Sequence, residues 1–233
     1  MSPTDAPFPS VRIRAMNNLI QTFAVYALPI LFAITLHEAA HAYAARYFGD
    51  NTAFMQGRMS LNPIKHIDPV GTLLIPIVLF FVGSPFLFGY AKPVPVEYRN
   101  LRNPKRDMAW VALAGPAANL FMALLWMIGA IMLGTVQAPD DFFMRMTQAG
   151  ILTNLVIFAF NLFPVPPLDG GRILTSLLPV RYAYKYAQLE AYGFFIVLGL
   201  AMLGFLKYWM APVMMAANTA LMALISPLTF LLS

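Results

Sequence analysis

Two histidines and a glutamate occur at a spacing that suits metal chemistry. His37-Glu38-Ala39-Ala40-His41 reads HExxH, and it lies within a stretch that has the residue pattern of a helix. Residues i and i+4 share one face of a helix, so both imidazoles can reach one metal ion. Zinc accepts imidazole nitrogen and works in catalysis with three protein ligands and an open position for water. Glu38 adjoins the first histidine, where its carboxylate can take a proton from that water.

A third ligand has to come from elsewhere in the chain, which contains no cysteine. The remaining histidine, His66, has the surroundings of an ordinary loop histidine, and we leave it out of the site. Asp169 stands apart from the other acidic residues because it directly follows an apolar span, within residues 161–171, NLFPVPPLDGG. The prolines of that stretch cannot continue a helix, and irregular backbone at membrane depth is tolerated only against protein or a wet cavity. Asp169 is therefore the favoured ligand over Glu190 and Asp107, although a solvated interfacial turn would also explain it.

The composition indicates a membrane protein. Hydrophobic residues make up 60% of the chain and charged residues 11%, whereas soluble domains have about 45–50% and about 25%. The net charge is +5, but the basic residues lie in short loops between apolar runs. They therefore read as topology signals rather than as a nucleic-acid surface. The first residues lack the features of a cleavable signal peptide, and residues 1–17 are expected to form an N-terminal tail.

The apolar runs predict an all-α polytopic membrane protein with about five to six transmembrane helices. Residues 70–90 are apolar but interrupted by Pro76, Gly83, Pro85 and Gly89, so they form either a short span or a re-entrant hairpin. Basic loops are expected at 91–106 and 168–187, and a tight connection at 207–212. The predicted helical spans cover residues 18–47, 108–136, 150–163, 194–206 and 213–232.

Two motifs together carry a family resemblance. The pairing of HEAAH with residues 161–172, NLFPVPPLDGGR, resembles the site-2 protease family of intramembrane zinc metalloproteases. The resemblance extends to residues 115–119, GPAAN, and to residues 89–96, GYAKPVPV. It covers the chain from about Leu19 to Arg172, and it is closest to the compact subgroup that has neither PDZ nor CBS domains. Residues 18–233 are accordingly expected to form a single membrane-embedded metalloprotease domain.

The resemblance also implies an activity and a set of roles. The implied activity is that of a metalloendopeptidase which holds one zinc ion per chain and cleaves single-span membrane proteins within or near their transmembrane segments. The implied ligands are His37, His41 and Asp169, with Glu38 as the catalytic base. Asn161 occupies the asparagine position of the family and is expected to contact the substrate.

A substrate helix must unwind before its peptide bonds can be attacked, and an extended chain can pair with a free strand edge. Residues 86–96 are the candidate for that edge, with short strands near the site, although a plain connecting loop would also explain them. Gly89, Tyr90 and Lys92 are the expected substrate contacts. For Asn119, in the GPAAN motif, we expect helix packing rather than a role in the reaction.

The charges of the loops also predict an orientation. The basic loops 91–106 and 168–187 place one end of the bundle in the cytoplasm, and the metal site is expected at that end, in a prokaryotic plasma membrane. The N-terminus then lies outside, against the preference of Arg12 and Arg14. Two other functions stay open: a membrane zinc protease whose third ligand is Glu190, and a metal-binding scaffold or transporter without catalysis. The lipid bilayer and substrates are the expected partners, nucleic acid is not, and the oligomeric state is left open.

Overall fold

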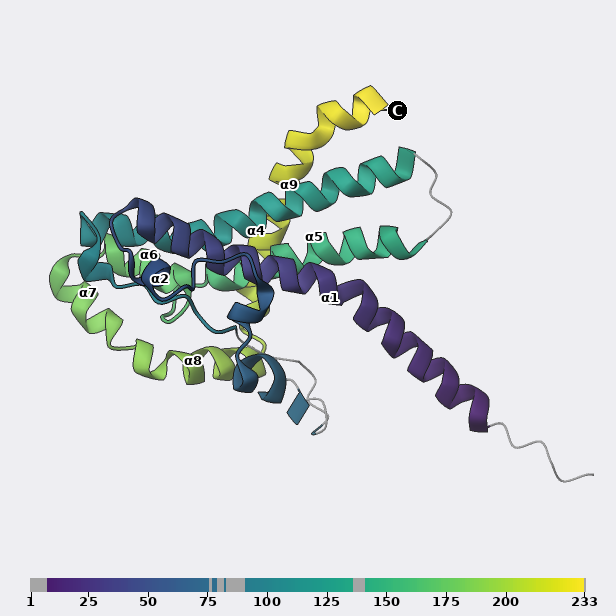
Figure 1. Ribbon diagram of the computed structural model, residues 1–233, viewed down its shortest axis with the longest axis horizontal. Coiled ribbons are helices and arrows are strands. Elements are labelled where there is room, and N and C mark those ends of the chain that lie inside the picture. Colours follow the sequence, from purple (N-terminus) through teal and green to yellow (C-terminus); the bar gives the residue numbers. More distant parts are fainter. Residues whose placement is uncertain (1–7, 76, 79–81, 83–90, 136–140, 233) are drawn as a thin grey trace, which may run out of the picture.

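The computed structural model describes residues 8–75, 77, 78, 82, 91–135 and 141–232, and these residues are helical or irregular. No strand occurs among them. The helices run in chain order as shown in Figure 1. Their bounds are α1 Phe8–Tyr47, α2 Thr52–Met55, η1 Pro63–His66, η2 Pro69–Leu74, η3 Tyr98–Asn100, α4 Pro104–Thr135, α5 Asp141–Asn161, α6 Asp169–Leu177, α7 Val180–Ala187, α8 Glu190–Met202 and α9 Leu206–Leu232.

Four of the described helices are long and apolar enough to cross a membrane. They contain stretches of 28, 32, 20 and 25 residues in α1, α4, α5 and α9. At about 1.5 Å per residue, about 20 residues already match the roughly 30 Å of a hydrocarbon core. Helix α8, with 13 residues, is shorter. The predicted class of all-α membrane protein is confirmed, and the expected number of about five to six spans stays a prediction.

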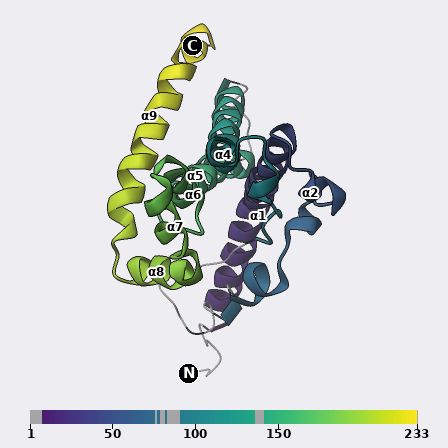
Figure 2. The ribbon, with the colours of Figure 1, turned by 90° about the vertical axis from the view of Figure 1, so that its left-hand side faces the viewer.

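Helix α4 lies at the centre of the bundle. It packs against α1, α5, α6 and α9, and Figure 2 shows α1 and α9 on opposite sides of it. One apolar cluster joins α4, α5 and α9, and a second joins α1 to α4 through Ala45, Leu101 and Val111. The first cluster consists of Ala123, Met127, Leu155, Ala217, Leu221 and Ile225. These contacts hold the end of α1 that carries the HExxH sequence against the N-terminal half of α4.

Several helix boundaries differ from those predicted. Helix α1 begins at Phe8 rather than at residue 18, and Pro9 fits there because the first turn has no use for its missing N–H. Helix α5 begins at Asp141, before the predicted start of the span 150–163. Helix α9 includes Pro212, which the sequence pattern assigns to a connection. A proline inside a membrane helix is tolerated because neighbouring helices and local adjustments satisfy the backbone group that it frees.

Two predicted irregular segments also have more structure than expected. Residues 168–187, predicted as a basic loop, contain the short helices α6 and α7. The start of the predicted hairpin 70–90 lies in the π-helical turn η2, whereas most of residues 76–90 lie outside the described part of the chain. Residues 91–97 have no regular secondary structure and pair with no strand among the described residues.

Candidate metal centre

The two histidines of the HExxH sequence meet Asp169 inside the protein. His37 and His41 stand one turn apart on α1, with 3.0 Å between their Nε2 atoms. Oδ2 of Asp169 lies 3.2 Å from Nε2 of His37 and 3.3 Å from Nε2 of His41. His37 and Asp169 are both buried. The structure therefore brings together the three residues that the sequence singled out as metal ligands.

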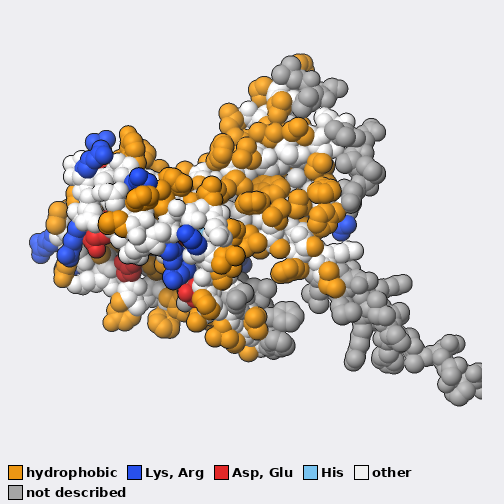
Figure 3. Space-filling view, in the orientation of Figure 1, with side chains coloured by type: hydrophobic (Ala, Val, Ile, Leu, Met, Phe, Trp, Pro, Cys, Tyr) orange, Lys and Arg blue, Asp and Glu red, His pale blue; other side chains and the backbone are white. Residues whose placement is uncertain are grey.

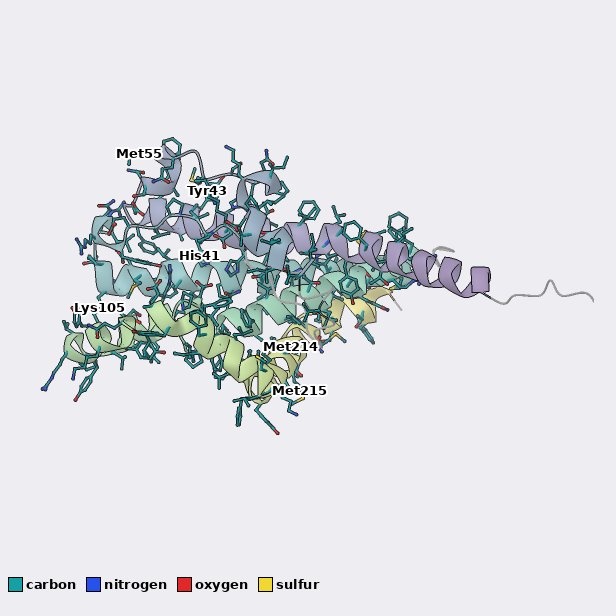
Figure 4. The ribbon with its side chains drawn as sticks, turned by 90° about the horizontal axis from the view of Figure 1, so that it is seen from below. His41, Tyr43, Met55, Lys105, Met214 and Met215 are labelled. Carbon is teal, nitrogen blue, oxygen red and sulfur yellow. The ribbon has the colours of Figure 1, made fainter. Side chains whose placement is uncertain are left out.

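Hydrogen bonds to α4 determine which ring nitrogens face this cluster. Nδ1 of His41 lies 2.7 Å from the backbone carbonyl of Val111, which can only accept, so Nδ1 carries the proton. In Figure 4, His41 lies between the ribbons of α1 and α4. Nδ1 of His37 lies 2.6 Å from Oδ1 of Asn119 and donates to it in the same way. When the imidazoles of His37 and His41 are neutral, the Nε2 atom of each ring carries no proton and offers a lone pair.

This arrangement fits a metal ion. Two Nε2 lone pairs and a carboxylate oxygen converge, and no donor among the described residues bonds Oδ2 of Asp169. Such a group is self-repelling unless a cation lies between its members. With bonds of about 2.0–2.1 Å, tetrahedral zinc separates its ligand atoms by about 3.3–3.4 Å. The observed separations of 3.0, 3.2 and 3.3 Å are close to that value.

Gly115 allows α4 to approach the imidazoles. A Cβ atom at this position would lie 2.3 Å from Nε2 of His41 and 2.6 Å from Cε1 of His37. No real side chain tolerates such contacts. The glycine of the GPAAN motif is thus required by the two histidines, a contact that the sequence alone did not reveal.

Asn119 has a different role from the packing that we predicted. Its side chain is buried, and its Nδ2 donates to the carbonyl of Ala33 at 3.1 Å and to Oδ1 of Asn154 at 3.0 Å. Both bonds turn Oδ1 toward His37. Asn154 in turn donates to the carbonyl of Gly150 at 2.8 Å. The sequence analysis did not identify Asn154. The feature that could have identified it is an amide side chain within an apolar span, where polar side chains are costly.

The chain between α5 and α6 brings Asp169 to the cluster. Helix α5 ends at Asn161, the proline-rich residues 162–168 are irregular, and Asp169 is the first residue of α6. A Cβ atom on Gly170 would lie 2.1 Å from the carbonyl oxygen of Leu162. The absence of a side chain at Gly170 therefore lets the turn fold back closely on the start of α6.

Glu38 lies beside the cluster without belonging to it. Its Oε2 accepts a hydrogen bond from the backbone N–H of Val94 at 2.8 Å. Glu38 is also close enough to His41 for their charges to interact. A carboxylate in this position can exchange a proton with a water molecule next to the three converging side chains.

The two alternative third ligands lie elsewhere. Oε1 of Glu190 is 3.4 Å from the guanidinium of Arg172, on an exposed side chain. Oδ2 of Asp107 accepts the backbone N–H of Asn103 at 2.8 Å, at the start of α4. The geometry thus favours Asp169 over both.

The predicted substrate contacts stay predictions. Gly89 and Tyr90 lie outside the described residues. Lys92 is described, and its backbone N–H donates to the carbonyl of His66. The side chain of Asn161 donates to the carbonyl of Ile157 in its own helix at 3.0 Å. His66 is itself buried, with Nε2 bonded to the carbonyl of Ser60 at 2.8 Å.

Comparisons with known proteins point in one direction. The family model of Peptidase family M50 matches residues 136–204. The protein named "Putative zinc metalloprotease YwhC" from Bacillus subtilis is 40% identical over 210 residues, which cover 85% of this chain and 90% of the relative. "Putative zinc metalloprotease Rip2" from Mycolicibacterium smegmatis is 31% identical over 184 residues, which cover 77% of this chain and 67% of the relative. No solved structure matches the chain.

Proposed function

Because the chain belongs to peptidase family M50, the site-2 protease family, and is a zinc metalloprotease of the membrane, we propose that it hydrolyses peptide bonds within or near the transmembrane segments of single-span proteins. The observation that carries the proposal is the depth of the cluster. His37 lies ten residues before the end of α1, which is about 15 Å along the helix axis. A substrate bond must come to that level to be cut.

The ligand roles follow from the converging lone pairs. His37, His41 and Asp169 would hold one zinc ion, with their Nε2 and Oδ2 atoms directed at it. When bound, zinc supplies a Lewis acid that polarises the attacking water and the scissile carbonyl. The bonds from Nδ1 of the two histidines to Asn119 and Val111 keep both rings in the orientation that this requires.

Glu38 is the proposed catalytic base. Its carboxylate takes a proton from the attacking water and passes it to the leaving amine, which restores the base for the next turnover. The hydrogen bond from the N–H of Val94 holds this carboxylate in a defined position before the substrate arrives. We also propose that Asn161 and the segment that contains Gly89, Tyr90 and Lys92 contact the substrate backbone.

We further propose that the site opens toward the cytoplasm of a prokaryotic cell. The relatives named above come from prokaryotes. Figure 3 shows Lys and Arg side chains gathered at the end of the molecule that carries α6 and α7, and an apolar surface over the middle of the bundle. Short loops rich in Lys and Arg favour the cytoplasmic side. The basic residues of segments 91–106 and 168–187 outnumber Arg12 and Arg14 near the N-terminus; they are Lys92, Arg99, Arg102, Lys105, Arg106, Arg172, Arg181 and Lys185.

A comparison of membrane proteomes tests the proposal. Cells with Glu38→Gln in place of the wild-type chain should accumulate single-span proteins as uncut stubs, because zinc still binds but the base is lost. Glu190→Gln is the matched control, since this glutamate pairs with Arg172 away from the cluster. Identical membrane proteomes in wild-type and Glu38→Gln cells would contradict the proposal and favour a metal-binding scaffold.

A further inference from the structure

The irregular segment 91–97 uses its backbone donors in an unusual way. Of the four residues from Lys92 to Pro95, two are prolines and carry no N–H. The N–H of Lys92 donates to the carbonyl of His66 at 2.9 Å. The N–H of Val94 donates to Oε2 of Glu38 at 2.8 Å. Both backbone N–H groups of these four residues are therefore bonded within the protein, and one of them holds the proposed base.

Val94 is held in place on both sides of its peptide. Its side chain is 7% exposed and packs against Ala42 of α1 and Ala53 of α2. Nη2 of Arg58 donates to the carbonyls of the two residues before Val94, at 3.0 and 3.3 Å. The N–H of Val94 thus has a defined position even without Glu38.

The flanking prolines maintain this geometry. A residue that precedes proline is disfavoured in the helical region and stays extended. Lys92 precedes Pro93, and Val94 precedes Pro95. The direction of the Val94 N–H is therefore set by the local sequence, before any contact with the substrate.

The bond also restrains Glu38. A glutamate side chain on a helix has several rotatable bonds, so an unrestrained carboxylate would spend much of its time away from the attacking water. At 2.8 Å, the Val94 bond has the length of a charge-assisted hydrogen bond. It occupies Oε2, and Oε1 is then the oxygen that takes the proton.

We propose that Val94 is a positioning residue for catalysis, and that its backbone N–H holds the carboxylate of Glu38 in the orientation in which it accepts the proton of the attacking water. This inference rests on the proposed role of Glu38. Pro93 and Pro95, which flank Val94, have no backbone N–H. Val94 is therefore the residue between them whose N–H can bond the carboxylate of Glu38.

The same arrangement limits how a substrate pairs with this segment. Because the backbone N–H groups of Lys92 and Val94 are bonded to His66 and Glu38, the backbone of residues 92–95 offers an incoming strand only carbonyl groups. Two of these carbonyls, those of Lys92 and Pro93, already accept from Arg58. A substrate paired here donates its own N–H groups, and it lies in a fixed register relative to the base. This refines the expected strand edge at residues 86–96.

Substitutions at Val94 test the proposal, with the purified, zinc-loaded full chain in lipid nanodiscs. The substrate is a synthetic single-span peptide that carries a fluorophore and a quencher on either side of a helix-breaking Asn-Pro pair. Val94→Pro removes the N–H and should lower kcat about 10- to 100-fold, because a base displaced by about 1 Å loses that much. KM and zinc content should change little.

Two conservative variants separate the N–H from the side chain. Val94→Ile and Val94→Ala keep the donor and should keep kcat close to the wild-type value, even if Val94→Ala unfolds at a lower temperature. A loss of kcat in Val94→Ala equal to that in Val94→Pro would overturn the proposal, since packing would then explain both. An unchanged kcat in a folded Val94→Pro variant would overturn it as well.

A double-mutant cycle, measured by thermal unfolding, tests the hydrogen bond between Val94 and Glu38 independently of activity. Val94→Pro should lower the midpoint of thermal unfolding more in the wild-type background than in a Glu38→Ala background, where the acceptor is gone. Equal decreases in both backgrounds would show that the two groups do not interact and would overturn the inference. A wild-type chain that fails to cut the peptide contradicts the proposed function instead, and the cycle still decides whether Val94 holds Glu38.

Discussion

Gly115 on α4 and His41 on α1 approach so closely that a single added carbon at Gly115 would lie 2.3 Å from the Nε2 atom of His41. This nitrogen is one of the three atoms that converge on the candidate zinc site. The α1–α4 contact and the metal site therefore depend on each other.

Gly115→Ala should displace the imidazoles and lower zinc affinity by about 10- to 100-fold, as expected when ligands lose their orientation. Metal analysis after dialysis against a range of free zinc concentrations measures this. Gly134→Ala is the matched control in the same helix, because nothing lies within 4 Å of its added Cβ. Equal zinc affinity in the two variants would show that the close approach does not constrain the site.

Asp169→Asn should abolish stable zinc binding, because the third ligand loses its negative charge at a site with two neutral imidazoles. Zinc at about 100 times its dissociation constant should stabilise the wild-type chain by about 2.7 kcal/mol and raise its midpoint temperature of unfolding. In the Asp169→Asn variant, zinc should no longer raise this midpoint. Glu190→Gln should leave both properties unchanged. Loss of zinc in Glu190→Gln alone would reassign the third ligand to Glu190.

Asn119→Ala should lower zinc affinity by about 10- to 100-fold, since the ring of His37 loses the acceptor that orients it. Isothermal titration with zinc in a competing chelator gives the affinity. Asn161→Ala serves as the comparison, because its side chain bonds only to its own helix among the described residues. A normal zinc affinity together with a raised KM in Asn161→Ala would support the proposed substrate contact.

Asp50, just after α1, gives a prediction for pH. Burial alone would raise the pKa of its carboxyl group, but hydrogen bonds from Thr52, Asn100 and the N–H of Glu97 outweigh it and lower the pKa below its usual value. A lowered pKa in the folded state contributes stability above the unfolded value of about 3.9, and this stability is lost as the pH falls through the folded value. The midpoint temperature of unfolding should therefore decrease at pH values below about 4.

The Asp50→Asn variant should unfold at a lower temperature at neutral pH and lose that part of the pH dependence. Thermal scans of the detergent-solubilised chain between about pH 3 and pH 7 measure it. Asp50 also fastens Glu97, three residues after Val94, so the variant should have a reduced kcat. A midpoint with the same acid dependence in both proteins would contradict the assignment to Asp50.

Much of the candidate site could be predicted from the sequence, because the relevant distances are local. Helical periodicity alone places His37 and His41 on one face of α1, and the structure has their Nε2 atoms 3.0 Å apart. The scarcity of acidic residues beside apolar spans singled out Asp169. The membrane class followed from composition, since a chain with so many apolar and so few charged residues has no soluble alternative.

The tertiary structure alone decided which groups orient these side chains. The sequence pattern favours a packing role for Asn119, and it gives no sign of the carbonyl of Val111 or the N–H of Val94. Every residue has a carbonyl and every residue except proline has an N–H, so no residue type marks the backbone group that will bond a given side chain. That choice depends on how closely α4 and residues 91–97 approach α1, which is set by packing between segments far apart in the chain. The sequence by itself determined which side chains could hold the metal, and the packing of α4 and residues 91–97 against α1 determined how they are held.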